Sequence, residues 1–203
     1  MDRVITYIDG FNLYFGLKSS NWKRYYWLNL QRLAQNLLIP NQQLVYTKYF
    51  TSRIAKPARK HQRQTIYLEA LGTLADFSIT YGHYQHNPHT CPKCGYVETI
   101  PNEKMTDVNI AEEMLGDAYQ DRFDTALLIS ADSDLTAPIE KVRQFFPDKR
   151  IVVIFPPNRV SKELKKVASA YLVMGRGVIA GSLFPEQVVT TRGYVLQRPV
   201  EWK

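Results

Sequence analysis

A chain of 203 residues, 45% of them hydrophobic, is long enough to bury the core of one α/β domain. Its 26 lysines and arginines exceed its 19 acidic residues by 7, and this basic surplus fits a polyanionic partner better than a basic one. No stretch approaches the ~18 consecutive apolar residues that cross a bilayer, and the first residues lack the apolar segment of a secretory signal. We therefore expect a cytoplasmic protein with no membrane partner.

Short β-rich runs alternate with helical patterns along most of the chain. The runs that predict strands are Val4–Ile8, Leu44–Phe50, Asp76–Tyr81, Ala126–Ile129 and Ile151–Phe155, with a shorter candidate at Tyr171–Met174. The helical patterns between them cover Leu13–Leu17, Leu30–Leu38, Arg53–Leu74, Thr106–Tyr119, Leu135–Val142 and Ser161–Ala170. This alternation predicts an α/β fold of the Rossmann-like kind. Its sheet would be doubly wound and mainly parallel, with about five strands and helices on both faces.

Carboxylates follow two of these strands at the point where each ends. Asp132 and Asp134 follow the buried run Ala126–Ile129, and Asp9 follows the first strand. Ligands of open α/β sheets bind at the carboxyl ends of the strands. A simpler interpretation stays open for each acid, because Asp favours both helix caps and tight turns.

Asp107 is a third site where an acid has two interpretations. Thr106 can cap the following helix, which places Asp107 in a first turn, where the helix dipole favours a carboxylate. However, residues 101–140 hold 10 of the 19 acids and only two basic residues. We expect some of these acids, among them Glu113, Asp117 and Asp121, only to solvate a helix face. The contrast still indicates a local acidic centre within a basic protein.

The predicted topology brings the scattered acids to one place. If the first and fourth strands are neighbours at the switch point of the sheet, Asp9 and Asp132 meet there, with Asp134 on the same loop and Asp107 above it. Four carboxylates so close would repel one another. Mg²⁺ or Mn²⁺ would relieve that repulsion and prefers oxygen ligands, so the sequence predicts a divalent metal site.

Basic residues gather between the second and third strands. The segment Arg53–Arg63 contains no acid, which suits either a solvated helix face or the wall of a groove for nucleic acid. The residues that we assign to RNA contact are Arg53, Lys56, Arg59 and Lys60. Aromatic residues also interleave with basic ones over residues 22–27, where they could stack on nucleobases or form the edge of the core.

Residues 84–104 interrupt the α/β alternation with a small insertion rich in Cys and His. Cys91 and Cys94 lie three positions apart, as in a zinc knuckle, and His83 and His86 are our choice of the two further ligands. Such a zinc ion would brace a segment that lacks its own core. A redox Cys-x-x-Cys pair and two free thiols are the other interpretations.

The last part of the chain has a different composition. Residues 175–203 are punctuated by Gly and Pro and predict a mostly irregular tail, with a hairpin around Gly193. We therefore expect one domain over residues 1–174, carrying the insertion, followed by a C-terminal extension over residues 175–203.

Three short motifs together resemble the NYN domain family of PIN-like, metal-dependent ribonucleases. The motifs are Asp9-Gly10-Phe11-Asn12, Lys104-Met105-Thr106-Asp107-Val108 and Ser130-Ala131-Asp132-Ser133-Asp134. Their order and spacing match that family across about residues 1–174. The resemblance implies a PIN-like sheet, a Mg²⁺ or Mn²⁺ site and endonucleolytic cleavage of RNA. It also implies catalytic roles for Asp9, Asp107, Asp132 and Asp134, with Asn12 orienting a metal-bound water or the phosphate.

From this resemblance we expect a metal-dependent ribonuclease that prefers single strands. One alternative is a non-catalytic RNA-binding or regulatory module with the same fold. Another is a hydrolase of small phosphate esters, although Phe11 stands where a phosphoaspartyl enzyme of the haloacid dehalogenase type has its second acid. The sequence also leaves open whether the protein forms a homodimer.

Overall fold

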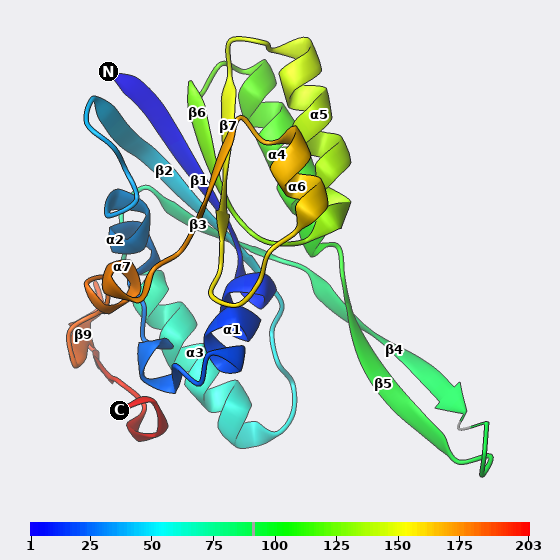
Figure 1. Cartoon of the computed structure of the whole chain (residues 1–203). Helices are drawn as coiled ribbons and strands as arrows, with labels where there is room; N and C mark the ends of the chain where they lie inside the picture. Colours follow the sequence, from blue (N-terminus) through cyan, green and yellow to red (C-terminus); the bar gives the residue numbers. More distant parts are fainter. Residues whose placement is uncertain (91) are drawn as a thin grey trace.

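Six parallel strands form the central sheet of the computed structural model, in the order β3-β2-β1-β6-β7-β8 (Figure 1). The structure describes residues 1–90 and 92–203, without the side chains of residues 84–90 and 98–103. The strands are β1 Asp2–Asp9, β2 Gln42–Thr51, β3 Phe77–Tyr81, β6 Thr125–Ile129, β7 Arg150–Phe155 and β8 Ala170–Val173. The doubly wound parallel sheet is confirmed. It has six strands because the short candidate near Tyr171 does form β8.

Helices cover both faces of this sheet (Figure 1). One face carries α1 Gly10–Ser19, α2 Leu30–Gln35, α3 Ala58–Leu71 and α7 Arg176–Ala180, and the other carries α4 Thr106–Tyr119, α5 Thr136–Phe145 and α6 Lys162–Val167. Strand β1 alternates between the two cores, since Val4 and Ile8 belong to one hydrophobic cluster and Ile5 and Tyr7 to the other. No helix in the described ranges is long and apolar enough to cross a membrane.

The basic segment after β2 folds differently from its prediction. A helix was expected from Arg53 onward, but α3 begins only at Ala58, after Pro57. A proline disfavours the helical conformation of the residue before it, so Lys56 is a natural helix boundary. Arg53 and Lys56 therefore lie in the loop that leads into α3.

The insertion forms a two-stranded antiparallel hairpin that projects from the body of the molecule (Figure 1). Its strands are β4 His83–Thr90 and β5 Val97–Lys104. His83 and Cys94 are exposed. Cys91 and the side chain of His86 lie outside the described residues, so the zinc site stays a prediction.

The C-terminal segment packs on the core instead of trailing away from it. It contains α7, the hairpin strands β9 Gln187–Val189 and β10 Val195–Gln197, and the 3₁₀ helix η3 Val200–Trp202. The expected hairpin around Gly193 is confirmed. Phe184 and Trp202 share one hydrophobic cluster with Trp27, whose Nε1 donates a 2.7 Å hydrogen bond to the carbonyl of Pro185. The division at residue 174 stays a prediction.

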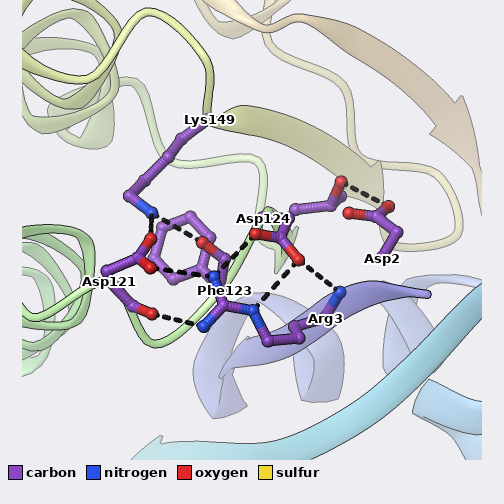
Figure 2. Close-up of polar contacts among 7 residues, drawn as sticks. Asp2, Arg3, Asp121, Phe123, Asp124 and Lys149 are labelled. Carbon is purple, nitrogen blue, oxygen red and sulfur yellow. Dashed lines mark hydrogen bonds and ion pairs between the residues drawn. The ribbon is translucent and has the colours of Figure 1, made fainter.

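An ion-pair network fastens the amino-terminal end of the sheet (Figure 2). The guanidinium of Arg3 on β1 donates to both carboxylate oxygens of Asp124, at 2.7 and 3.1 Å, and Lys149 donates to Asp121 at 2.6 Å. Arg3 also pairs with Asp121 at 3.1 Å, which joins the Arg3–Asp124 pair to the Lys149–Asp121 pair. The hydrogen bonds from the Arg3 side chain and backbone lower the pKa of Asp124 to about 2. The network joins the starts of β1, β6 and β7.

We predict that Arg3→Gln lowers the free energy of unfolding at neutral pH, and that this difference disappears in acid. Asp124 has a depressed pKa in the folded state, so its contribution is complete above the unfolded value of ~3.9. That contribution is lost as the pH falls through about 2. Urea denaturation at several pH values measures the difference, with Arg32→Gln on the surface of α2 as the control. A difference that stays constant from neutral pH to about pH 2 would contradict the assignment.

Candidate metal centre

Three carboxylates meet at the carboxyl end of the sheet. Strands β1 and β6 are neighbours, with Ile8 opposite Ile129, so Asp9 lies beside the loop that follows β6. Asp9, Asp107 and Asp132 each offer an oxygen, and these oxygens all lie within 4.8 Å of one another. Asp107 reaches the group from the first turn of α4. The structure thus brings together three of the four acids that the sequence singled out.

Asp9 is the buried member of this three-acid cluster, with 1% of its surface exposed. Its Oδ1 accepts from the backbone N–H of Asn12 at 2.9 Å, and its Oδ2 accepts from the amide of Asn12 at 2.5 Å and from the hydroxyl of Ser130 at 2.8 Å. Burial raises the pKa of Asp9, and the nearby charge of Asp132 raises it further. Its hydrogen-bond donors within the described chain, from Asn12 and Ser130, are all neutral and do not compensate its charge.

Asn12 connects Asp9 to a cation that sequence reasoning missed. Its Nδ2 donates to Asp9, and its Oδ1 accepts from Arg159 Nε at 2.8 Å and from the backbone N–H of Ala131 at 3.3 Å. The first role of this amide is therefore to position Asp9. Arg159 follows β7, the next parallel strand, and its place after a strand end is the only signal that the sequence offers.

Asp132 serves both as a cap and as a member of the three-acid cluster. Its Oδ1 accepts from the backbone N–H of Asp134 at 3.1 Å, which caps the 3₁₀ helix η2 Ser133–Leu135. Its own N–H donates to Ser130 Oγ at 3.0 Å. Asp134 is exposed and is not a member of the cluster. The geometry therefore gives no support to Asp134 as a metal ligand.

The start of α4 also departs from the expected cap. Met105, with φ of 80° in the left-handed region, precedes the helix, whereas Thr106 is its buried first residue. Asp107 still falls in the first turn, as predicted. The helix dipole favours a carboxylate there, and the same position points Asp107 toward the other two acids.

Other acids of the same segment form structural ion pairs. Asp117 was expected to solvate a helix face, but it is 2% exposed, pairs with Lys48 at 2.5 Å and accepts from Tyr7 Oη at 2.6 Å. Glu113 also pairs with Lys48 at 2.5 Å, and Asp121 belongs to the Arg3 network. For Asp117 the expectation was wrong, because the buried Lys48 on β2 requires carboxylate partners.

Gly10 lets α1 begin directly against β2. A Cβ atom at this position would lie 2.7 Å from the carbonyl oxygen of Phe50 and 2.8 Å from the ring of Tyr49. The backbone carbonyl of Phe50 cannot move away to make room for a Cβ atom, so only glycine allows this close approach. The contact fixes the first turn of α1, and with it Asp9 and Asn12, at the edge of the sheet.

The four predicted RNA contacts do not lie together. Lys56 and Lys60 line a groove of about 660 Å³ that runs along α1, whereas Arg53 lies over the ring of Tyr81, with its guanidinium 4.7 Å from the ring centroid. Arg59 is exposed on α3 and does not line the groove. Gly10, which directly follows Asp9, also lines this groove.

The family model of the NYN domain matches residues 3–175, which contain all three acids. The chain belongs to the NYN domain family. NYN domains have a nuclease-like fold and act on RNA. This fits the acidic cluster at the end of the sheet, which could bind a metal.

Two further similarities accompany the family match. A Pseudomonas putida protein named 6-hydroxy-3-succinoylpyridine 3-monooxygenase HspA is 26% identical over 191 residues, a match that covers 77% of this chain and 60% of that protein. The chain thus corresponds to less than two thirds of that relative. A crystal structure of a Vibrio parahaemolyticus protein of unknown function aligns with a TM-score of 0.55 at 16% identity. It covers 90% of this chain and 96% of the other, and it supports the fold alone.

The three-acid cluster has the donor set of a hard divalent cation, because its ligands are all carboxylate oxygens. We predict that Mn²⁺ or Mg²⁺ raises the melting temperature of EDTA-treated protein. At a free metal concentration 100 times the dissociation constant, binding would stabilise the folded state by about 2.7 kcal/mol. The raised pKa of Asp9 means that protons compete with the metal at a higher pH than for an ordinary aspartate. Metal affinity should therefore fall as the pH is lowered.

Thermal unfolding and calorimetric titration measure this stabilisation. Asp132→Asn keeps the cap on η2, because Asn is also a good N-cap, but it removes a charged ligand, so the metal-induced shift should be lost. Asp148→Asn, an exposed acid before β7, is the matched control and should behave like the wild type. Equal metal responses in the two variants would show that Asp132 does not bind the ion.

Proposed function

We propose that the chain is a divalent-metal-dependent endoribonuclease that hydrolyses phosphodiester bonds of single-stranded RNA. The observation that carries this proposal is the buried, uncompensated Asp9 within reach of Asp107 and Asp132. A buried carboxylate without a cationic partner is costly, and a bound metal ion would remove that cost. Membership of the NYN family and the basic surplus of the chain both favour RNA as the substrate.

Each residue of the centre has a proposed task. Asp9, Asp107 and Asp132 would hold Mg²⁺ or Mn²⁺, which when bound supplies Lewis-acid activation of water and neutralises phosphate charge. Asn12 and Ser130 keep Asp9 in one orientation through their hydrogen bonds. Outer partners of this kind affect metal affinity and activity by about 10- to 100-fold.

Arg159 is the cation best placed to meet the substrate. Its Nε is engaged by Asn12, which leaves its terminal nitrogens for a phosphate oxygen. In this position the guanidinium would neutralise charge that develops on the phosphate during hydrolysis. The arrangement places a donor for the phosphate one side chain away from the buried Asp9.

The decisive experiment incubates a labelled single-stranded RNA pool with Mn²⁺, Mg²⁺ or EDTA. We expect cleavage with metal and none with EDTA. Asp132→Asn should lose more than about 100-fold in rate, while its circular dichroism spectrum stays that of the wild type. Asp148→Asn should cut normally. RNA binding in a gel shift without cutting would instead indicate a regulatory module, and turnover of a small phosphate ester alone would indicate a phosphohydrolase.

A second candidate is hydroxylation of an aromatic ring, as the name of the Pseudomonas putida relative describes. The groove beside the acids is lined by rings, among them Tyr14, Phe15 and Tyr26, which could hold a planar heterocycle. Such a reaction would insert one oxygen atom of O₂ and release the other as water, with two electrons from a reduced nucleotide. Incubation of a hydroxypyridine with NADH and O₂ separates this activity from RNA cleavage.

A further inference from the structure

The proposed reaction does not by itself explain the groove along α1. It lies between α1, the loop before α3, α3 itself and the end of the C-terminal segment, and its volume is about 660 Å³. None of the residues that line it is acidic. A groove lined only by neutral and basic side chains favours an anionic occupant.

A row of four aromatic rings forms one wall of the groove. The ring of Tyr14 lies 5.3 Å from that of Phe15 and 5.2 Å from that of Tyr26, which in turn lies 5.8 Å from the ring of Trp202. Tyr14 and Phe15 are 40% and 43% exposed, and Lys18 Nζ lies over the Phe15 ring, 5.6 Å from its centroid, so exposed rings and a cation lie side by side. Adjacent exposed rings of this kind are stacking surfaces for planar groups.

Cations face this wall from several elements. The basic residues that line the groove are Lys18, Lys23, Lys56, Lys60 and Arg63. Arg63 is committed to an ion pair with Glu201 at 2.7 Å. The four lysines form no ion pair with any side chain in the described part of the chain, so their charges remain available to phosphates.

Some of the residues that line the groove are neighbours of the metal centre in the chain or in the sheet. Gly10 and Phe11 line it, and they directly follow Asp9 along the chain. Thr51 also lines it, one residue after Phe50, which is the register partner of Asp9. A strand of nucleic acid that presents a phosphate to the acids can therefore continue into the groove without leaving the surface.

The C-terminal segment completes the groove from outside the NYN domain. Trp202 lies beyond residue 175, where the family match ends. Its ring packs at 5.9 Å against Tyr67 on α3, and the neighbouring Glu201 pairs with Arg63 on the same helix. Of the four rings, Trp202 therefore lies outside the residues that match the family, whereas the other three lie within them.

We propose that this groove is a stacking subsite for one or two unpaired nucleobases of an RNA whose next phosphate lies at the three-acid cluster. Tyr14 and Phe15 supply the ring faces, and Lys56 and Lys60 hold the phosphates. Bases within a duplex cannot offer their faces to protein rings, so the subsite selects single strands. The inference rests on the proposed function, which it deepens by assigning how the substrate is chosen.

Fluorescence anisotropy with a labelled single-stranded RNA in EDTA tests the subsite without any cleavage. Tyr14→Ala should weaken binding by about tenfold, because base–aromatic stacking contributes that much or more. Tyr14→Phe keeps the ring and should restore wild-type affinity. Tyr119→Ala, which removes a ring that is 81% exposed at the far end of α4, is the matched control and should change nothing.

Two further arms separate stacking from charge. An abasic nucleotide at the contacted position should remove the difference between wild type and Tyr14→Ala. In a plot of the logarithm of the binding constant against the logarithm of the salt concentration, each single-strand phosphate contact contributes ~0.7 to the slope. A double variant, Lys56→Gln with Lys60→Gln, should therefore make this slope shallower by about 1.4. The control pair, Lys162→Gln with Lys166→Gln on α6, should leave the slope unchanged.

The outcomes distinguish this inference from the proposed function. If wild type cuts RNA with Mn²⁺ but Tyr14→Ala binds and cuts as well as Tyr119→Ala does, only the subsite is wrong. If binding depends on Tyr14 but no metal supports cleavage, the subsite stands and the nuclease proposal fails. Equal affinity for duplex and single strand, or binding of a hydroxypyridine without any binding of RNA, would overturn the subsite.

Discussion

The burial of one negative charge, that of Asp9, is the constraint on which the rest of this site depends. Asp9 ends the central strand of a parallel sheet, where solvent is excluded and where Asp132 adds a second charge. Asn12 and Ser130 supply neutral hydrogen bonds, which orient the carboxylate but do not compensate its charge. With Gly10 tightly packed to hold it in place, this carboxylate and its two acidic neighbours could bind a divalent cation.

The helix α1 couples the two halves of the proposed active site. Its first turn carries Asn12 toward the acids, and its exposed side carries Tyr14 and Phe15 into the groove. Because the strand order places β1 between β2 and β6, this helix starts at the switch point of the sheet. The helix therefore lies next to Asp9, which ends β1 and approaches Asp132 after β6, and it also contributes residues to the groove.

The sequence was most informative where periodicity and strand ends decide the structure. The bounds Thr106–Tyr119 of α4 follow from its apolar pattern. The approach of Asp9 and Asp132 was predicted on the condition that the doubly wound topology makes β1 and β6 neighbours, and they are neighbours. Arg159 could not be predicted, since it reaches Asn12 only through the tertiary fold. The β4–β5 hairpin was missed because prolines inside its strands argue against a strand.

The opposite charges of the two surfaces imply an order of binding in the proposed enzyme. The lysine-lined groove attracts RNA whether or not a metal is bound, whereas Asp9, Asp107 and Asp132 repel a phosphate until a cation neutralises them. Metal and scissile phosphate must then favour each other's binding by the same factor, because coupling between two sites is reciprocal. The groove would hold the bases first, and the metal would decide whether the adjoining phosphate can settle among the acids.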